Sequence, residues 1–273
     1  MLITLAGALA LGVAAAPWAA AAAPAAAAAR AAPHSRYPGD QGLTWAQIAK
    51  LPDWQGIWQL DWEHHLRLLG GMSPEHDLTP KAKAYYTAFR GKQKFGEDVQ
   101  PQTANCLPPG MPQIMAQPYP VEFLFNPGKV VILIEAYEQE RTVYTDGRKH
   151  PAADVLTPTF QGNSIGHWDG DTLVIDTVGI LPSQGAGPHK GAGIASGVPS
   201  DGAMHIIERI RMVDHDHMLI TRTIIDPKVL AKPWTVTLPY VRQSGDLLEY
   251  VCEEGNRDSS TANGVPGERI GGL

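Results

Sequence analysis

The stretch MHIIERIRMVDHDHMLITRTII, residues 204–225, decides the expected fold. Apolar and polar side chains alternate on both sides of residues 214–216, and this period of two predicts two half-buried β-strands joined by a hairpin turn. Each strand carries one charged residue on its otherwise apolar face, Glu208 in the first and Arg222 in the second. Whether these two residues share a face depends on the length of the turn, which the pattern alone does not define.

Similar short strands, separated by turn residues, recur along the chain. Because no helical segment of crossover length lies between those after residue 121, a parallel α/β sheet is disfavoured. We therefore expect an all-β chain that closes into an antiparallel, lipocalin- or calycin-like barrel, with a β-sandwich as the second choice. The tripeptide Gly56-Ile57-Trp58 matches the Gly-x-Trp of lipocalins. The expected strands are residues 54–60, 122–125, 129–137, 141–145, 164–168, 172–178, 205–213, 218–225, 234–242 and 247–253.

Two short helices are expected before the barrel. Thr44 and Gln47 can form a capping box for a helix that Pro52 ends, and Thr79-Pro80 is a typical N-cap and first helical residue. The proline-studded residues 100–120 are not expected to form regular structure. The predicted organisation is an export leader at 1–32, a helical and proline-rich wrap at 33–120, the barrel at 121–258 and a flexible tail at 259–273.

The composition disfavours several classes of partner. The 273 residues have a formal net charge of −6 and no run of Lys or Arg, so nucleic-acid binding is not expected. Residues 2–13 are apolar and precede an Ala/Pro-rich stretch, a pattern typical of a secretory signal, although no Lys or Arg comes before it. No later apolar run is long enough to span a membrane. We expect a periplasmic or secreted protein.

The two cysteines, Cys106 and Cys252, lie far apart in the sequence and neither belongs to a CxxC pair. In an oxidising compartment two such residues most simply form a disulfide. Two buried free thiols are the alternative.

Ionisable residues on apolar strand faces are the candidates for a functional site, because such groups are costly to bury unless they are paired or used. A histidine near a carboxylate can perform general acid/base chemistry, and Arg or Tyr can hold an anionic group. A structural ion pair is the simpler interpretation of Glu208 with Arg222. The predicted catalytic residues are Glu208, His167 and Arg222. The predicted substrate contacts are Arg141, Tyr144, Asp176, His205 and Tyr137.

No metal or cofactor is expected. The tract at 214–217 contains two His and two Asp, but a solvated turn is the simpler interpretation. The chain has neither HExxH nor Gly-x-Ser-x-Gly, which disfavours a zinc protease and a serine hydrolase. The Gly- and Pro-rich connection at 179–203 is long enough to be a lid or binding loop.

Several longer motifs resemble a family of uncharacterised secreted bacterial proteins. They include NCLPPGMP at 105–112, SIGHWDGDTLVIDT at 164–177, KPW at 232–234 and EYVCEE at 249–254. The resemblance implies export and a β-rich fold, and it favours the disulfide because both cysteines lie within motifs. It implies no reaction. The chain departs from the family pattern at 179–203, and at position 167, where Arg is more usual than His.

Together these features predict an exported enzyme without a cofactor. A lyase or isomerase is favoured over a hydrolase. Its expected substrate is a small, partly apolar hydroxylated or aromatic compound bound in a barrel pocket. Glu208 or His167 would be the base, and Arg141, Tyr144 and Arg222 would hold the substrate. A non-catalytic lipocalin-like carrier is the alternative, and a structural protein of the cell envelope is a third interpretation. The chain could also form an oligomer.

Overall fold

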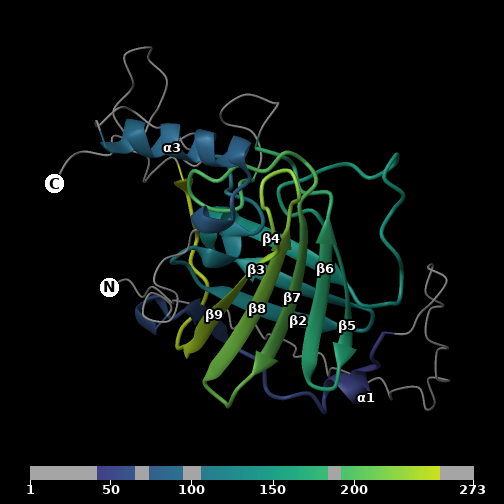
Figure 1. Cartoon of the computed structure of the whole chain (residues 1–273). Coiled ribbons are helices and arrows are strands. Elements are labelled where there is room, and N and C mark those ends of the chain that lie inside the picture. The colour runs from purple at the N-terminus through teal and green to yellow at the C-terminus, as the bar shows by residue number, and fades with distance from the viewer. Residues whose placement is uncertain (1–41, 65–73, 95–105, 184–191, 253–273) are drawn as a thin grey trace, which may run out of the picture. The chain divides into compact units, whose positions relative to one another are not determined.

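The centre of the protein is a closed barrel of nine strands (Figure 1). The computed structural model describes residues 42–64, 74–94, 106–183 and 192–252. The barrel confirms the expected all-β fold with short helices. Its strands are β1 (Ile57–Leu60), β2 (Val121–Asn126), β3 (Lys129–Ile134), β4 (Gln139–Tyr144), β5 (Asn163–Asp169), β6 (Thr172–Val178), β7 (His205–Met212), β8 (His217–Ile225) and β9 (Trp234–Gln243).

The strands follow one another around the barrel in chain order, and β1 closes it by pairing with both β2 and β9. The barrel therefore includes a strand from the region that the sequence assigned to the wrap. Neighbouring strands are antiparallel except for β4 and β5, whose short pairing is parallel. This is the one departure from the expected antiparallel order. A parallel pair needs a long connection, and residues 145–162 supply it.

The hairpin of β7 and β8 has the alternation that the sequence predicts. Glu208 lies directly across from Arg222 in the register. Both side chains are buried, so the turn brings the two charges onto the inner face of the barrel. The question of turn length that the sequence left open is thereby answered.

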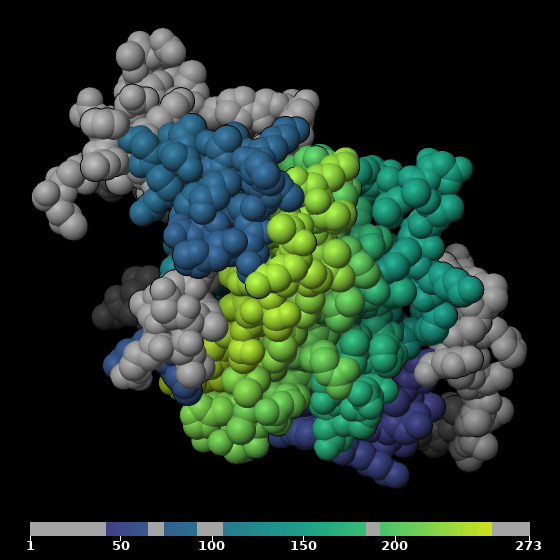
Figure 2. Space-filling view, in the orientation of Figure 1, coloured from purple at the N-terminus to yellow at the C-terminus, as the bar shows by residue number. Residues whose placement is uncertain are grey.

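Both expected helices are present. Helix α1 (Trp45–Ile48) has the predicted capping box between Thr44 and Gln47. Helix α3 (Pro80–Lys94) lies across one end of the barrel (Figures 1 and 2), where Thr79 Oγ1 accepts from the Ala82 N–H and donates to the Lys228 carbonyl oxygen. Among the described residues, no helix combines the length and apolar character needed to cross a membrane.

Residues 110–116 of the proline-rich segment pack against the inner face of the barrel. The side chains of Met111, Ile114 and Met115 are almost completely buried in the core. Contrary to expectation, part of the segment is regular, because Gln113–Ala116 forms one turn of 3₁₀ helix, η3. We call residues 110–116 the plug. Gly110 begins it with φ of +66°, and a Cβ there would lie 2.7 Å from that of Ala192, so only glycine fits without strain.

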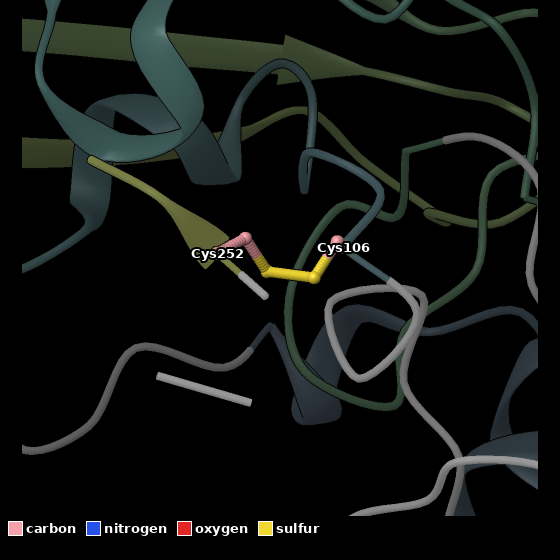
Figure 3. The surroundings of a disulfide bond; sticks show 2 residues. All are labelled: Cys106 and Cys252. Atoms are coloured by element: carbon pink, nitrogen blue, oxygen red, sulfur yellow. A yellow bond between two sulfur atoms is a disulfide. The ribbon is translucent and has the colours of Figure 1, made fainter. Parts of the chain in front are cut away.

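A disulfide joins Cys106, just before the plug, to Cys252, after β9 (Figure 3). The expected pairing is therefore confirmed, and the alternative of two free thiols is wrong. The two cysteines are 146 positions apart, and strands β2 to β9 lie between them in the sequence. The bond therefore connects the two chain segments that flank most of the barrel.

Two expected strands differ from the structure. Residues 246–251 form no strand, because β9 already pairs with β1 and the closed barrel leaves no free edge there. The strand expected at 129–137 ends at Ile134, because Tyr137 has φ of +58° within a short 3₁₀ turn, η4 (Ala136–Glu138). The expectations for residues 1–32 and 259–273, and for part of the loop at 179–203, fall outside the described residues.

Candidate functional site

The barrel wall separates the candidate residues into two clusters. An inner cluster contains Arg141 on β4, Glu208 on β7 and Arg222 on β8, all buried. An outer cluster contains Asp176 on β6 and His205 on β7, both partly exposed. The alternation of side chains along each strand decides this division, since neighbouring positions face opposite sides of a barrel wall.

In the inner cluster, one carboxylate bridges two guanidinium groups. Arg141 Nη2 lies 2.6 Å from Glu208 Oε2, and Arg222 Nε donates to Glu208 Oε1 at 3.2 Å. Arg141 also donates to the hydroxyl oxygens of Ser164 and Thr177, at 3.2 and 2.8 Å. Each oxygen of Glu208 therefore lies within ion-pair distance of a guanidinium nitrogen, but only Oε1 accepts a hydrogen bond among the described residues.

The plug completes this cluster. Arg222 Nη1 donates to the Pro112 carbonyl oxygen at 2.9 Å, and the buried Tyr240 hydroxyl donates to the carbonyl oxygen of Met115. The polar atoms of the inner face are thus used to hold the chain's own segment. A ligand pocket at Arg141, Glu208 and Arg222, as expected from the sequence, therefore has less support, because the plug already uses these polar groups.

The electrostatics of Glu208 are unfavourable for a general base. Burial raises the pKa of its carboxyl, but the charges and hydrogen bonds of Arg141 and Arg222 outweigh burial and leave the pKa below its ordinary value. A carboxylate with a low pKa and two arginine partners accepts a proton poorly. The structural ion pair considered from the sequence is the better description of this group.

In the outer cluster, one carboxylate oxygen contacts two imidazoles. Asp176 Oδ1 lies 2.8 Å from His205 Nε2 and 3.1 Å from His150 Nε2. The other ring nitrogen of His150 lies 2.7 Å from Asn163 Oδ1. The side chains of His150, His205 and Asp176 are 20, 35 and 41 % exposed, so the group is anchored on the barrel wall and still reachable from solvent.

This geometry suits proton transfer. A carboxylate that accepts from the Nε2–H of an imidazole orients the ring and leaves the Nδ1 atom as a base, while the imidazolium form is stabilised by the same carboxylate. Asp176 has two imidazole partners, His205 from β7 and His150 from the connection between β4 and β5, and of these His150 has its Nδ1 atom in contact with Asn163 Oδ1. One imidazole can act as the base while the other supplies a proton.

The surroundings of the outer cluster are mixed in character. Tyr144, Ile165, Asp176 and Ile207 are neighbours in register across β4 to β7, and all are partly exposed. Arg148 stacks on the Tyr144 ring, with its guanidinium carbon 3.7 Å from the ring centre. The outer face thus places aromatic and aliphatic surface beside the ionisable groups.

Asp146 holds Arg148 in this position. The Arg148 Nε donates to Asp146 Oδ1 at 2.9 Å. The hydrogen bond from Arg148 lowers the pKa of the Asp146 carboxyl further than burial raises it. Tyr144 therefore has a fixed cation over its ring.

His167 does not join either cluster. It is exposed on the outer face of β5, next to the turn that leads to β6, and so lies on the opposite side of the wall from Glu208. Glu208 and His167, each considered as a possible base, therefore do not converge on one pocket wall, because their side chains face opposite sides of the barrel wall.

Tyr137 belongs to a separate aromatic group with Tyr119 and Tyr250. Its ring centre lies 5.0 Å from that of Tyr250, which is 5.2 Å from that of Tyr119. Burial and a hydrogen bond with Tyr137 raise the pKa of Tyr250 to about 12. A phenol of this kind remains protonated at neutral pH, and the group lies apart from both clusters in the described contacts.

Sequence reasoning missed His150. It lies in the irregular connection between β4 and β5, where no period of two indicates a face. The only available signal was its place two residues after Arg148, in a segment already marked by the turn at Asp146-Gly147. Asp176 and His205 were identified from the sequence. Asp176 was expected to be a charged residue on a buried strand face, but the structure places its side chain on the outer face of the barrel.

No group of three or more His, Cys, Asp or Glu side chains is arranged to hold a metal ion in the part of the chain that the structure describes. The distances around Asp176 are those of hydrogen bonds. Neither the protein-family models nor the curated proteins include a match to this chain. The family resemblance of its motifs therefore stays a prediction.

Proposed function

We propose that this protein is an exported enzyme that performs general acid/base chemistry on small molecules at the outer cluster of His150, Asp176 and His205. The reaction class is elimination or isomerisation. The observation that carries the proposal is a single carboxylate oxygen contacted by two imidazoles in a partly exposed position. The disulfide supports a periplasmic or extracellular location, since such bonds persist in oxidising compartments.

The proposed roles follow from the hydrogen bonds. Asp176 accepts from Nε2 of His205 and orients its ring, so that His205 Nδ1 takes a proton from the substrate. His150 returns a proton to the leaving oxygen or to the carbon that becomes saturated, and its Nδ1–H exchanges Asn163 Oδ1 for the substrate to do so. The proton removed and the proton returned balance, and no redox partner is needed.

The substrate class is inferred from the neighbouring surface. Tyr144 and Ile165 lie in register with Asp176 on one side and Ile207 on the other. A partly apolar compound with a hydroxyl group would contact aliphatic or aromatic surface while its polar group reaches the imidazoles. A carrier is the second candidate, although the packing of the plug against the inner face gives it less support.

A substrate screen with matched variants tests the proposal. The purified protein is incubated with a panel of hydroxylated aromatic and terpenoid compounds, and loss of each compound is followed by mass spectrometry. With His205→Gln or Asp176→Asn we expect turnover to fall by about 100-fold or more, the usual contribution of a general acid/base group. Thermal unfolding confirms that each variant is folded.

His217→Gln is the matched control, because His217 Nδ1 also lies 2.8 Å from a carboxylate oxygen, that of Asp214 in the β7–β8 turn. It should leave turnover unchanged. Full activity in both outer-cluster variants would overturn the proposal. Loss of activity in Glu208→Gln alone would show that the general base is Glu208, in the barrel interior. Binding of a compound without turnover would favour the carrier.

A further inference from the structure

The inner cluster carries an unbalanced charge. Arg141, Glu208 and Arg222 together have two positive charges and one negative charge, and their side chains are 1, 0 and 3 % exposed. The pKa of Glu208 is lowered, so its carboxyl stays ionised at neutral pH. Tyr240, which interacts electrostatically with all three side chains, has a raised pKa because it is buried, and it is neutral at neutral pH. One net positive charge is therefore left on the cluster.

Two donors of the same cluster have no hydrogen-bond partner. Among the described residues, no atom accepts from Arg141 Nη1 or from Arg222 Nη2, and both nitrogens are closed to solvent. Every other nitrogen of these two guanidinium groups has a partner, either the carboxylate, a hydroxyl or the Pro112 carbonyl. The two unpartnered N–H groups therefore belong to the same three side chains as the unbalanced charge, and Glu208 Oε2 of that cluster also accepts no hydrogen bond among the described residues.

Such an arrangement is costly unless something compensates it. A buried charge without a counter-ion is strongly unfavourable in a medium of low dielectric constant, and a buried N–H without an acceptor loses its bond to water. A water molecule would satisfy a donor but not the charge. A single monovalent anion would do both.

We propose that the barrel core contains a binding site for a small monovalent anion of the halide type, which accepts from the free N–H group of Arg141 or of Arg222. The net charge of the cluster selects a monovalent ion. The closed surroundings select a small one, since the plug and the strands bury both guanidinium groups. This site is independent of the outer cluster, and either proposal can fail without the other.

Because both nitrogens are closed to solvent, the ion is expected to enter during folding. The protein is therefore unfolded in urea and refolded with its disulfide intact, in chloride or in gluconate at equal ionic strength. Gluconate is too large for the site. If one ion binds only the folded state, the unfolding equilibrium constant falls about tenfold for each tenfold rise in chloride above its dissociation constant. Equal stability in the two salts at all concentrations would overturn the proposal.

A structure locates the ion. Protein refolded in bromide is crystallised, and the anomalous signal of bromine is measured. We expect a peak at hydrogen-bond distance from Arg141 Nη1 or Arg222 Nη2. Water at both nitrogens and no peak in the core would refute the site.

Variants test the charge argument. Arg141→Met leaves one positive and one negative charge, so the chloride dependence should disappear, whereas Glu208→Gln leaves two positive charges and should lower the chloride dissociation constant. Arg209→Met is the matched control, because Arg209 pairs with Asp169 on the exposed surface and should not change the dependence. If the core variants do not fold, the salt series and the bromide structure of the unmodified chain decide the question.

Discussion

At the scale of single residues, two buried acids show how neighbours determine the state of a carboxyl group. Glu208 lies between two arginines and its pKa is lowered. Asp226, at the end of β8, is equally inaccessible, but burial and the nearby Asp201 carboxylate raise its pKa. The backbone N–H groups of Lys228 and Asp201 offset this only in part. At neutral pH an ionised carboxylate is therefore favourable to folding at Glu208 and unfavourable at Asp226.

Asp226→Asn should stabilise the protein at pH 7. The folded pKa of Asp226 is above its unfolded value, so folding favours the protonated form and the unfavourable contribution of the charge grows as the pH rises through the folded pKa. We expect a gain of about 1 kcal/mol in unfolding free energy at pH 7. Urea unfolding checks this.

The gain should be smaller at acidic pH than at pH 7, because the raised pKa lets Asp226 take up its proton in the folded chain before it would in the unfolded chain. Asp171→Asn, in the exposed β5–β6 turn, is the control and should change little at either pH. A gain that is the same at both pH values would show that charge is not the cause.

At the scale of elements, the seam between β1 and β9 depends on Arg242. Its guanidinium donates to the carbonyl oxygens of Asp53, Gln55 and His215, and lies 4.5 Å above the Trp58 ring. It thereby connects the chain entering β1 with the β7–β8 turn. A barrel has no edge only if its last strand meets its first, so this contact lies where closure is decided.

Arg242→Met should lower the unfolding free energy by about 2 to 3 kcal/mol, because it removes charge-assisted hydrogen bonds and leaves carbonyl groups without a donor. Arg209→Met removes an exposed ion pair with Asp169 and should cost less than about 1 kcal/mol. Chemical unfolding of both variants makes the comparison. Equal losses would mean that Arg242 contributes only as a surface charge.

At the scale of the whole molecule, the barrel, the plug and the disulfide form one unit. Cys106 precedes the plug, and Cys252 follows the last strand. The bond therefore keeps the residue just before the plug next to the segment that follows β9 even in the unfolded chain. A cross-link over so many residues restricts the unfolded state strongly.

Replacing both cysteines by serine should lower the unfolding free energy by about 2 to 5 kcal/mol. The comparison is urea unfolding of the unmodified protein with and without reductant, and of the Cys106→Ser/Cys252→Ser variant. Reductant should destabilise the unmodified protein and leave the variant unchanged. An unfolding midpoint that does not respond to reductant would contradict this role.

Local patterns in the sequence determined much of the fold. The period of two identified the strands from β2 to β9, and the capping residues identified where α1 and α3 begin. These features depend on neighbours a few positions apart, so they can be recognised from the sequence. The disulfide was predicted for a different reason. The protein is expected to work in an oxidising compartment, where two lone cysteines most simply pair.

Only the tertiary structure decided which face of each strand is buried and what lies against it. An alternating strand has two different faces, but the partner that covers one of them comes from far along the chain. This is why Asp176 faces outward, why Glu208 meets Arg141 as well as Arg222, and why His150 joins the outer cluster from an irregular connection. Long-range packing, which leaves no local period in the sequence, determined both candidate sites.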